Sequence, residues 1–248
     1  DKNPISINSL SYKKKSDLKA KIILSGSYEN NHKTIIKSFL YKEKKNIIKA
    51  NQISLNKKFK IKSLQEINFE YFDQDLRENK FKILKKKGNK YEIVGAKFNA
   101  NSLINNLIEN NSNDLKIFDK KFNFIIKIDQ VFLDKEHVVN NLKGNLNFDN
   151  NEIRNAELNA FFSKNKKLTL TIKKNDTEKV TTLFLDQAEP IVKRYKFIKG
   201  YKGGSLDFYS SKKGNKSFSN LKIYNFRLKD LPILTKLLTL ASLQGIAD

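Results

Sequence analysis

Alternation of apolar and polar residues is the feature that most constrains the fold of this chain. Apolar side chains occupy every second position in several successive stretches, and polar turns such as Asp149-Asn150-Asn151 separate these stretches. A period of two places the apolar side chains on one face of a β-strand. Short polar connections are typical of antiparallel strands that follow one another along a meander. The sequence therefore predicts an all-β fold with a few short helices, built on an elongated, mostly antiparallel, twisted sheet.

The clearest alternation lies between residues 122 and 172, and it defines a candidate apolar surface. The residues predicted to share this face are Phe122, Phe124, Ile126, Ile128, Leu146, Phe148, Leu158, Leu168, Leu170 and Ile172. Some strands extend to about ten residues, or about 33 Å, which is long for a globular protein. An open apolar trough and the filled core of a β-sandwich both need this alternation, so periodicity leaves the choice between them open.

Three stretches depart from the alternation and predict short helices. Apolar residues recur at helical spacing in residues 99–109, in residues 186–197 and in a final stretch that begins at Asp230. Asp186 and Asp230 are the predicted N-caps of the second and third helices, although Pro190 falls late for a helix that begins at Asp186.

The helices and a polar stretch near residues 110–114 give the expected organisation. We expect an N-terminal β segment over residues 1–110 that ends in a short helix, and a second β segment over residues 111–248 that ends in an amphipathic helix. No stretch of about twenty apolar residues occurs, so no membrane-spanning helix is predicted. The chain begins with Asp1 and contains no Met. We therefore expect it to be a piece of a longer protein.

The strong basic charge is a second prominent feature. The net charge is +23, but only four of the 49 basic residues are Arg. Specific phosphate and base recognition favours the planar fork of Arg. Lys is spread evenly and rises together with Asn, Ile and Phe, as in AT-rich genomes. We therefore attribute most of the charge to codon bias and expect no nucleic-acid partner.

Recognisable catalytic chemistry is absent from the sequence. There is no Cys, and His32 and His137 are far apart and lie in polar stretches, so we expect two exposed histidines, no metal site and no cofactor. No nucleotide-binding or nucleophile motif occurs. Asp73 and Asp75 leave a glycosidase pair open in principle, but solvated turn residues are the favoured interpretation. We expect that the chain is not an enzyme.

The C-terminal part resembles the conserved region of AsmA-like proteins, the group that includes TamB and YhdP. The resemblance starts with the strand pair at residues 144–148 and 156–160 and continues through a basic apolar stretch into Gly203-Gly204. It is clearest in residues 221–246, where a strand leads into Asp230-x-Pro232 and a Leu-rich stretch that closes in Ala-Ser-Leu-x-Gly. The motif positions are Gly203, Gly204, Asp230, Pro232, Ser242 and Gly245.

The resemblance implies an elongated β-groove with an apolar interior. It implies a non-enzymatic envelope protein in the periplasm, anchored to the inner membrane of a Gram-negative bacterium by an N-terminal helix. The partner would be phospholipid or another membrane lipid, and the function lipid transport and outer-membrane assembly. The alternative is a β-sandwich binding or structural module with a filled core and no lipid path.

Overall fold

The computed structural model describes residues 3–29, 33–108, 121–149, 152–194 and 200–228. Strands make up 69% of the described residues and helices 6%. The strands of the first part are β1 (Ile5–Ile7), β2 (Tyr12–Lys14), β3 (Lys21–Glu29), β4 (Lys33–Glu43), β5 (Asn46–Leu55), β6 (Ile61–Ser63), β7 (Glu66–Phe72), β8 (Glu78–Lys85) and β9 (Lys90–Asn99). Those of the second part are β10 (Phe122–Phe132), β11 (Val138–Asp149), β12 (Glu152–Ser163), β13 (Lys166–Lys174), β14 (Lys179–Leu185), β15 (Lys202–Lys213) and β16 (Lys216–Arg227).

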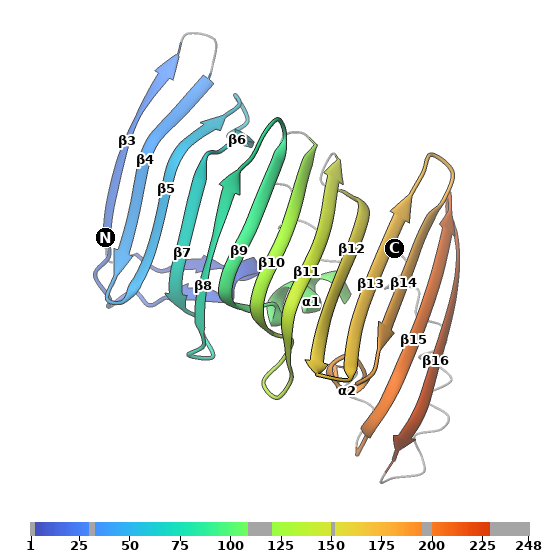
Figure 1. Cartoon of the computed structure of the whole chain (residues 1–248). Coiled ribbons are helices and arrows are strands. Elements are labelled where there is room, and N and C mark those ends of the chain that lie inside the picture. Colours follow the sequence, from blue (N-terminus) through green and yellow to red (C-terminus); the bar gives the residue numbers. More distant parts are fainter. Residues whose placement is uncertain (1–2, 30–32, 109–120, 150–151, 195–199, 229–248) are drawn as a thin grey trace.

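One sheet of 14 strands forms the body of the molecule (Figure 1). Its order runs from β16 back to β7 and then through β5 and β4 to β3, with β6 paired to β5, while β1 and β2 form a separate hairpin. Neighbouring strands are antiparallel except β9 and β10, which pair in parallel. A parallel pair needs a crossover connection. Here the connection includes the helix α1 (Asn101–Ile108).

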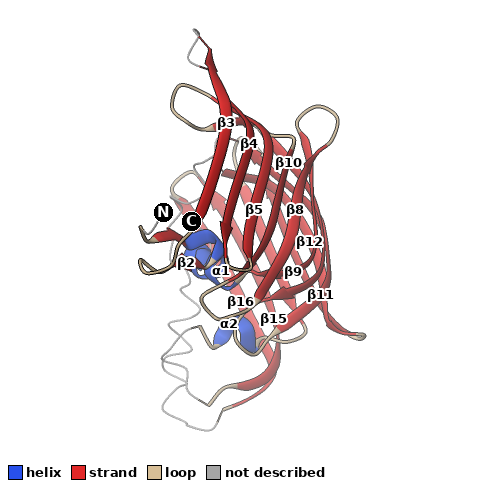
Figure 2. Cartoon of the chain, turned by 90° about the vertical axis from the view of Figure 1, so that its left-hand side faces the viewer, coloured by secondary structure: helices blue, strands red, loops and turns tan. Residues whose placement is uncertain are grey.

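The sheet is bent so that β3 and β16 lie toward the same side (Figure 2). Its concave side carries the hairpin β1–β2, the 3-10 helix η1 (Asn8–Leu10), α1 and α2 (Glu189–Val192), all near the end of the sheet that is lowest in Figure 1. We call this end the capped end and the opposite end the uncapped end. The apolar side chains of the strands lie on this concave face, where Tyr12 of β2 packs in one cluster with Tyr41 and Tyr71.

Contacts at the hairpin β1–β2 explain why Tyr12, Tyr41 and Tyr71 are buried. The Tyr12 ring meets Tyr41 and Tyr71 edge-on, with ring centroids 6.0 and 5.7 Å apart, a favoured aromatic arrangement. The Tyr12 hydroxyl lies 2.6 Å from that of Tyr41 and donates to Glu43 Oε2 at 3.1 Å. The buried polar atoms are therefore paired, as a buried site requires.

The predicted fold class is confirmed, including the small helical content. The first predicted helix exists as α1. The second prediction was wrong in its start: α2 begins at Glu189 with Pro190 in its first turn, and Ala188 is its N-cap. Asp186 instead accepts a hydrogen bond from the Lys167 N–H at 2.7 Å and links β13 to the end of β14. The third predicted helix, beginning at Asp230, lies outside the described residues.

Candidate functional site

A single line of residues crosses the concave face from β3 to β16, and we call it the apolar row. Each member is the direct cross-strand partner of the next. Its members are Leu24, Phe39, Ala50, Ile67, Ile83, Ile93, Ile126, Gly144, Leu158, Leu170, Leu183, Phe208 and Leu221. Adjacent strands lie about 4.8 Å apart, so the row extends for roughly 58 Å along the curved sheet.

Most of the apolar row keeps accessible surface. Only Ala50, Ile126 and Phe208 are buried, while Leu24 is 60% exposed and the other members are half-buried. Among the described residues, no second sheet of comparable size covers this face. A filled sandwich core would bury the central row on every strand. This row is therefore an apolar surface of unusual length that remains partly open to solvent.

All ten apolar residues predicted from the sequence lie on this concave face, but they differ in burial. Cross-strand pairs such as Phe122–Phe148, Leu158–Leu170 and Leu168–Leu185 place them on one side of the sheet. The buried members are Phe122, Phe124, Ile126, Ile128, Phe148 and Ile172. The half-buried members are Leu146, Leu158, Leu168 and Leu170. Only the second group offers much surface to a ligand.

An aromatic cluster fills the concave face of β9–β11 near the uncapped end. The ring centroid of Tyr91 lies 5.1 Å from that of Phe122, and those of Phe124 and Phe148 lie 6.1 Å apart at an angle of 85°. Leu64, which is 1% exposed, packs in the same core, and the Tyr91 hydroxyl forms a hydrogen bond with its backbone. This part of the face is a packed core.

The N-terminal edge of the same face is the most exposed part, and the sequence prediction missed it. Ile22, Leu24 and Tyr28 of β3 are 47, 60 and 65% exposed. Their pairing partners Tyr41, Phe39 and Thr34 belong to β4. Ile23 of β3 is an apolar residue on the other face, and a register shift between Ser25 and Gly26 leaves Lys37 of β4 without a partner in β3. Both features hid the alternation in the sequence.

Gly144 of β11 is the member of the apolar row that has no side chain, and it lies between Ile126 of β10 and Leu158 of β12. A Cβ at this position would lie 1.8 Å from the carbonyl oxygen of Glu157. Because such a contact is impossible for a real Cβ, only glycine fits this close approach of β11 and β12. The apolar surface therefore has a dip at Gly144, between the side chains of Ile126 and Leu158.

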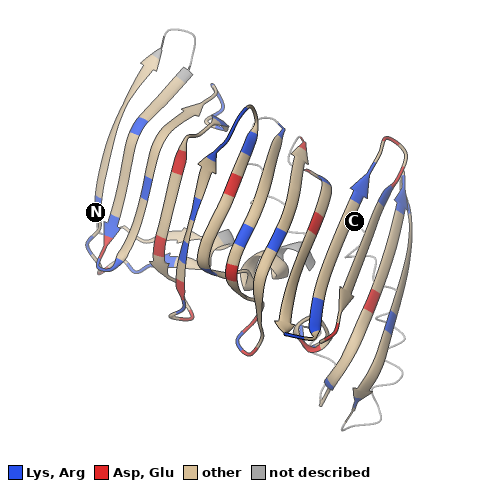
Figure 3. Cartoon of the chain, in the orientation of Figure 1, with Lys and Arg blue, Asp and Glu red and all other residues tan. Residues whose placement is uncertain are grey.

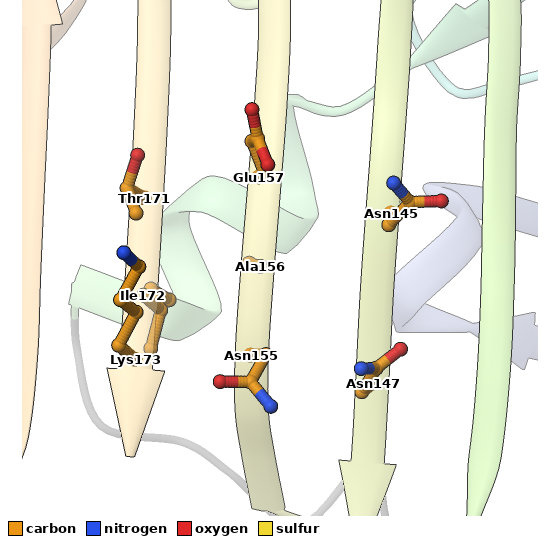
Figure 4. A pocket seen from close by; sticks show the side chains of 8 residues that line it. All are labelled: Asn145, Asn147, Asn155, Ala156, Glu157, Thr171, Ile172 and Lys173. Carbon is orange, nitrogen blue, oxygen red and sulfur yellow. The ribbon is translucent and has the colours of Figure 1, made fainter.

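The outer, convex face of the sheet carries many charged and polar residues, together with exposed rings such as Phe184 and Tyr209. Glu92 accepts hydrogen bonds from Lys127, at 2.8 Å, and forms an ion pair with Lys86 at 2.7 Å. The hydrogen bonds from these two ammonium groups lower the pKa of Glu92 to about 2, against the opposing effect of desolvation. Figure 4 shows a shallow hollow on this face, of about 280 Å³, with Asn145, Asn155 and Glu157 among its lining residues.

A cluster of polar groups lies at the capped end. His137 is 6% exposed, so the expectation of two exposed histidines was wrong for this residue; His32 lies outside the described residues. The Nδ1 atom of His137 is 2.8 Å from the Asp134 carboxylate, and its Nε2 atom is 3.6 Å from Glu189 Oε2. The cluster joins the β10–β11 turn to α2.

Glu136, His137 and Glu189 bring potential metal-binding atoms within 4.8 Å of one another. However, Lys193 Nζ lies 2.8 Å from Glu136 Oε2 and 2.9 Å from Glu189 Oε2. Burial alone would raise the pKa of Glu189, but the Gly203 N–H and Lys193 lower it. Because the chain supplies its own cation between the two carboxylates, we interpret the cluster as a clasp between α2, β15 and the β10–β11 turn. Sequence reasoning missed it because Glu189 is remote from His137 in the chain.

Asp73 is buried and Asp75 is exposed, although they belong to one turn. Asp73 is 4% exposed, and it accepts hydrogen bonds from the side-chain amides of Asn79 and Asn99 at 3.2 and 2.7 Å. It also accepts the backbone N–H groups of Asp75 and Arg77 at 2.9 and 3.0 Å. The interpretation of Asp73 as a solvated residue was therefore wrong, since the carboxylate organises a buried turn.

Two of the motif positions are described. Gly203 is the second residue of β15, and its N–H donates a hydrogen bond to Glu189 Oε1 at 2.6 Å. A Cβ at Gly204 would lie 2.7 Å from the Tyr201 hydroxyl oxygen, and the residue has φ of +80°. Both glycines therefore have local structural reasons. Asp230, Pro232, Ser242 and Gly245 lie outside the described residues.

Comparisons with known proteins identify no relative. No family model, no curated protein and no solved structure matches this chain. The AsmA-like resemblance therefore rests on the sequence motifs alone. None of the described helices is long and apolar enough to cross a membrane.

Proposed function

We propose that this chain binds the acyl chains of membrane lipids along the apolar row and serves as a lipid conduit. The observation that carries this proposal is the continuity of the row, which passes from β3 to β16 and keeps partly accessible side chains on most strands. Apolar ligands gain about 25 cal/mol for each Å² removed from water. Large contiguous apolar surfaces mark binding sites.

The proposed biological setting follows from the resemblance. We propose an AsmA-like envelope protein of the periplasm, held at the inner membrane, that passes phospholipid toward the outer membrane without chemical turnover. The length of the row supports transport better than storage, because roughly 58 Å exceeds what one acyl chain needs to be held. A β-sandwich module with a filled core is the second candidate, and the buried cluster around Phe122 and Phe124 favours it locally.

The test uses two neighbouring positions on opposite faces of β13. Leu170 belongs to the apolar row, and Thr171 points to the outer face, where it lines the polar hollow. Lipid is extracted from the purified protein and identified by mass spectrometry, and binding of a fluorescent fatty acid is titrated for Leu170→Asp and Thr171→Asp.

We expect bound phospholipid in the unmodified protein. Leu170→Asp should weaken fatty-acid binding at least about tenfold by placing a charge among acyl chains, whereas Thr171→Asp should leave it unchanged. Circular dichroism confirms that both variants fold. Folded protein without lipid, or equal binding by the two variants, contradicts the proposal.

A further inference from the structure

One turn at the uncapped end presents an aromatic side chain between lysines. Phe59 is 73% exposed and lies between Lys58 and Lys60 in the connection from β5 to β6. Lys57 and Lys58 are exposed as well. We call residues 56–60 the Phe59 turn. Exposure of the apolar Phe59 ring to water is unfavourable, so its position at the tip of a basic turn needs an explanation.

Hydrogen bonds fix the shape of the Phe59 turn. Asn56 Oδ1 accepts the backbone N–H groups of Lys58 and Lys60 at 2.8 and 3.1 Å. The Phe59 N–H donates to the Asn56 carbonyl oxygen at 2.9 Å. Phe59 has φ of +57°, a left-handed conformation in which glycine is the ordinary residue. The chain thus holds a Phe outward where folding alone would favour Gly.

The molecule contains the same turn at its capped end, with different charges. Residues 73–77, the Leu76 turn, join β7 to β8 and repeat the side-chain and backbone hydrogen bonds of the Phe59 turn. Leu76 has φ of +59° and is 82% exposed. Asp75 and Arg77 flank it, in the positions that Lys58 and Lys60 hold beside Phe59, and Gln74 stands in the position of Lys57. Exposure and shape are therefore shared, and the basic surroundings distinguish Phe59.

Further lysines lie at the same end. β5 and β8 both pair antiparallel with β7, so the Phe59 turn and the β8–β9 turn share the uncapped end (Figure 3). Lys87 is exposed there, and Lys86 is half exposed and forms an ion pair with Glu92. An aromatic ring surrounded by lysines matches the interface of an anionic bilayer. Apolar rings of surface-bound segments lie at the boundary between headgroups and acyl chains, and lysines attract acidic headgroups.

We propose that the Phe59 turn docks the uncapped end of the sheet onto an anionic lipid bilayer, with Phe59 inserted at the boundary between headgroups and acyl chains. Leu55 and Ile61, on either side of the turn, pack in the core of the concave face. Docking therefore brings that face next to the membrane. The inference goes beyond acyl-chain binding and does not require it, because a surface contact and an occupied apolar row are measured separately.

The chain offers a direct reporter because it contains no Trp. Phe59→Trp and Leu76→Trp each place a single fluorophore at the tip of one of the two turns. They are titrated with vesicles of phosphatidylcholine, with and without phosphatidylglycerol. We expect a blue shift for the Trp at position 59 with the anionic vesicles, weakened by salt. We expect no shift for the Trp at position 76.

Co-sedimentation with the same vesicles gives the second measurement. Phe59→Gly should weaken binding while keeping the fold, because glycine suits the left-handed backbone, and Leu76→Gly is its control. Replacing Lys57 and Lys58 by Glu should weaken binding more than about 25-fold, since each lysine near an anionic surface accounts for about fivefold. The same change at Lys44 and Lys45, an exposed pair in the β4–β5 turn of the capped end, should have little effect.

Three outcomes overturn the proposal. Equal blue shifts at both tips, or none at either, show that the Phe59 turn has no special contact. Equal losses from the two lysine pairs show that only the overall charge acts. Binding of a DNA duplex through Lys57 and Lys58 without vesicle binding identifies a nucleic acid as the partner instead.

Discussion

Strands β3 and β10 place apolar residues on the same concave face, yet the two strands have opposite environments. Leu24 of β3 is 60% exposed, whereas Ile126 of β10, in the same apolar row, is 8% exposed. Both positions have apolar cross-strand partners, Phe39 and Ile93. β3 is an edge strand with one neighbour, whereas β10 lies between β9 and β11, and Ile104 of α1 packs against the core cluster that contains Ile126. The alternation of a strand therefore decides which face a side chain occupies, while segments remote in sequence decide whether that face is filled.

Introducing a charge should separate the two strands by the largest effect. Ile126→Asp buries an unpaired carboxylate and should lower the free energy of unfolding by about 4 kcal/mol. Leu24→Asp leaves its carboxylate in water and should change it by less than about 0.5 kcal/mol. Urea denaturation followed by circular dichroism measures both. Similar losses at the two positions would show that β3 is covered in solution.

Truncation to Ala should give a smaller contrast within the ten predicted residues. Phe124→Ala removes a ring from the packed aromatic cluster and should cost about 3–5 kcal/mol. Leu170→Ala removes a half-buried side chain, leaves little cavity, and should cost about 1–2 kcal/mol. Thermal unfolding of the two variants measures the difference. Equal costs would mean that β13 is as tightly packed as β10.

The smallest effect on stability is expected on the outer face, from the ion pairs of Glu92. Its pKa is about 2 in the folded protein, below the ordinary value of 4.5, so its pairing with Lys86 and Lys127 stabilises the fold fully above pH 4.5. The contribution is lost as the pH falls from about 4.5 to 2. Both lysines are about half exposed, so solvent screening limits the effect to below about 1 kcal/mol. Glu92→Gln should flatten the acid side of the stability profile, and an unchanged slope would contradict the pairing.

The sequence predicted the faces of the strands because side-chain direction is a local property. Phe122, Leu158 and Leu170 share a face whatever surrounds them, and their registers agree with this. The parallel pairing of β9 with β10 was missed, since it depends on how the chain returns after α1. The burial of His137 was missed as well, because Asp134 is near in sequence but Glu189 and Lys193 come from α2 and its end.

The prediction that a helix starts at residue 186 was wrong for a related reason. An Asp before an apolar stretch predicts an N-cap, but Asp186 bonds the Lys167 N–H in the neighbouring strand connection. The helix begins three residues later, where Pro190 fits its first turn. A side chain with two possible backbone partners is assigned correctly only when the neighbouring strand is in view.

Site-specific photo-crosslinking to phospholipid tests the central claim most directly. A photoreactive amino acid is placed at Leu24, Leu170 or Thr171, and the folded protein is irradiated with labelled phospholipid. In the apolar row, Leu24 is exposed and Leu170 is half-buried, and Thr171 lies on the outer face next to Leu170. The account predicts lipid adducts at positions 24 and 170 and none at 171. Adducts at all three positions, or at none, would contradict a lipid-binding concave face.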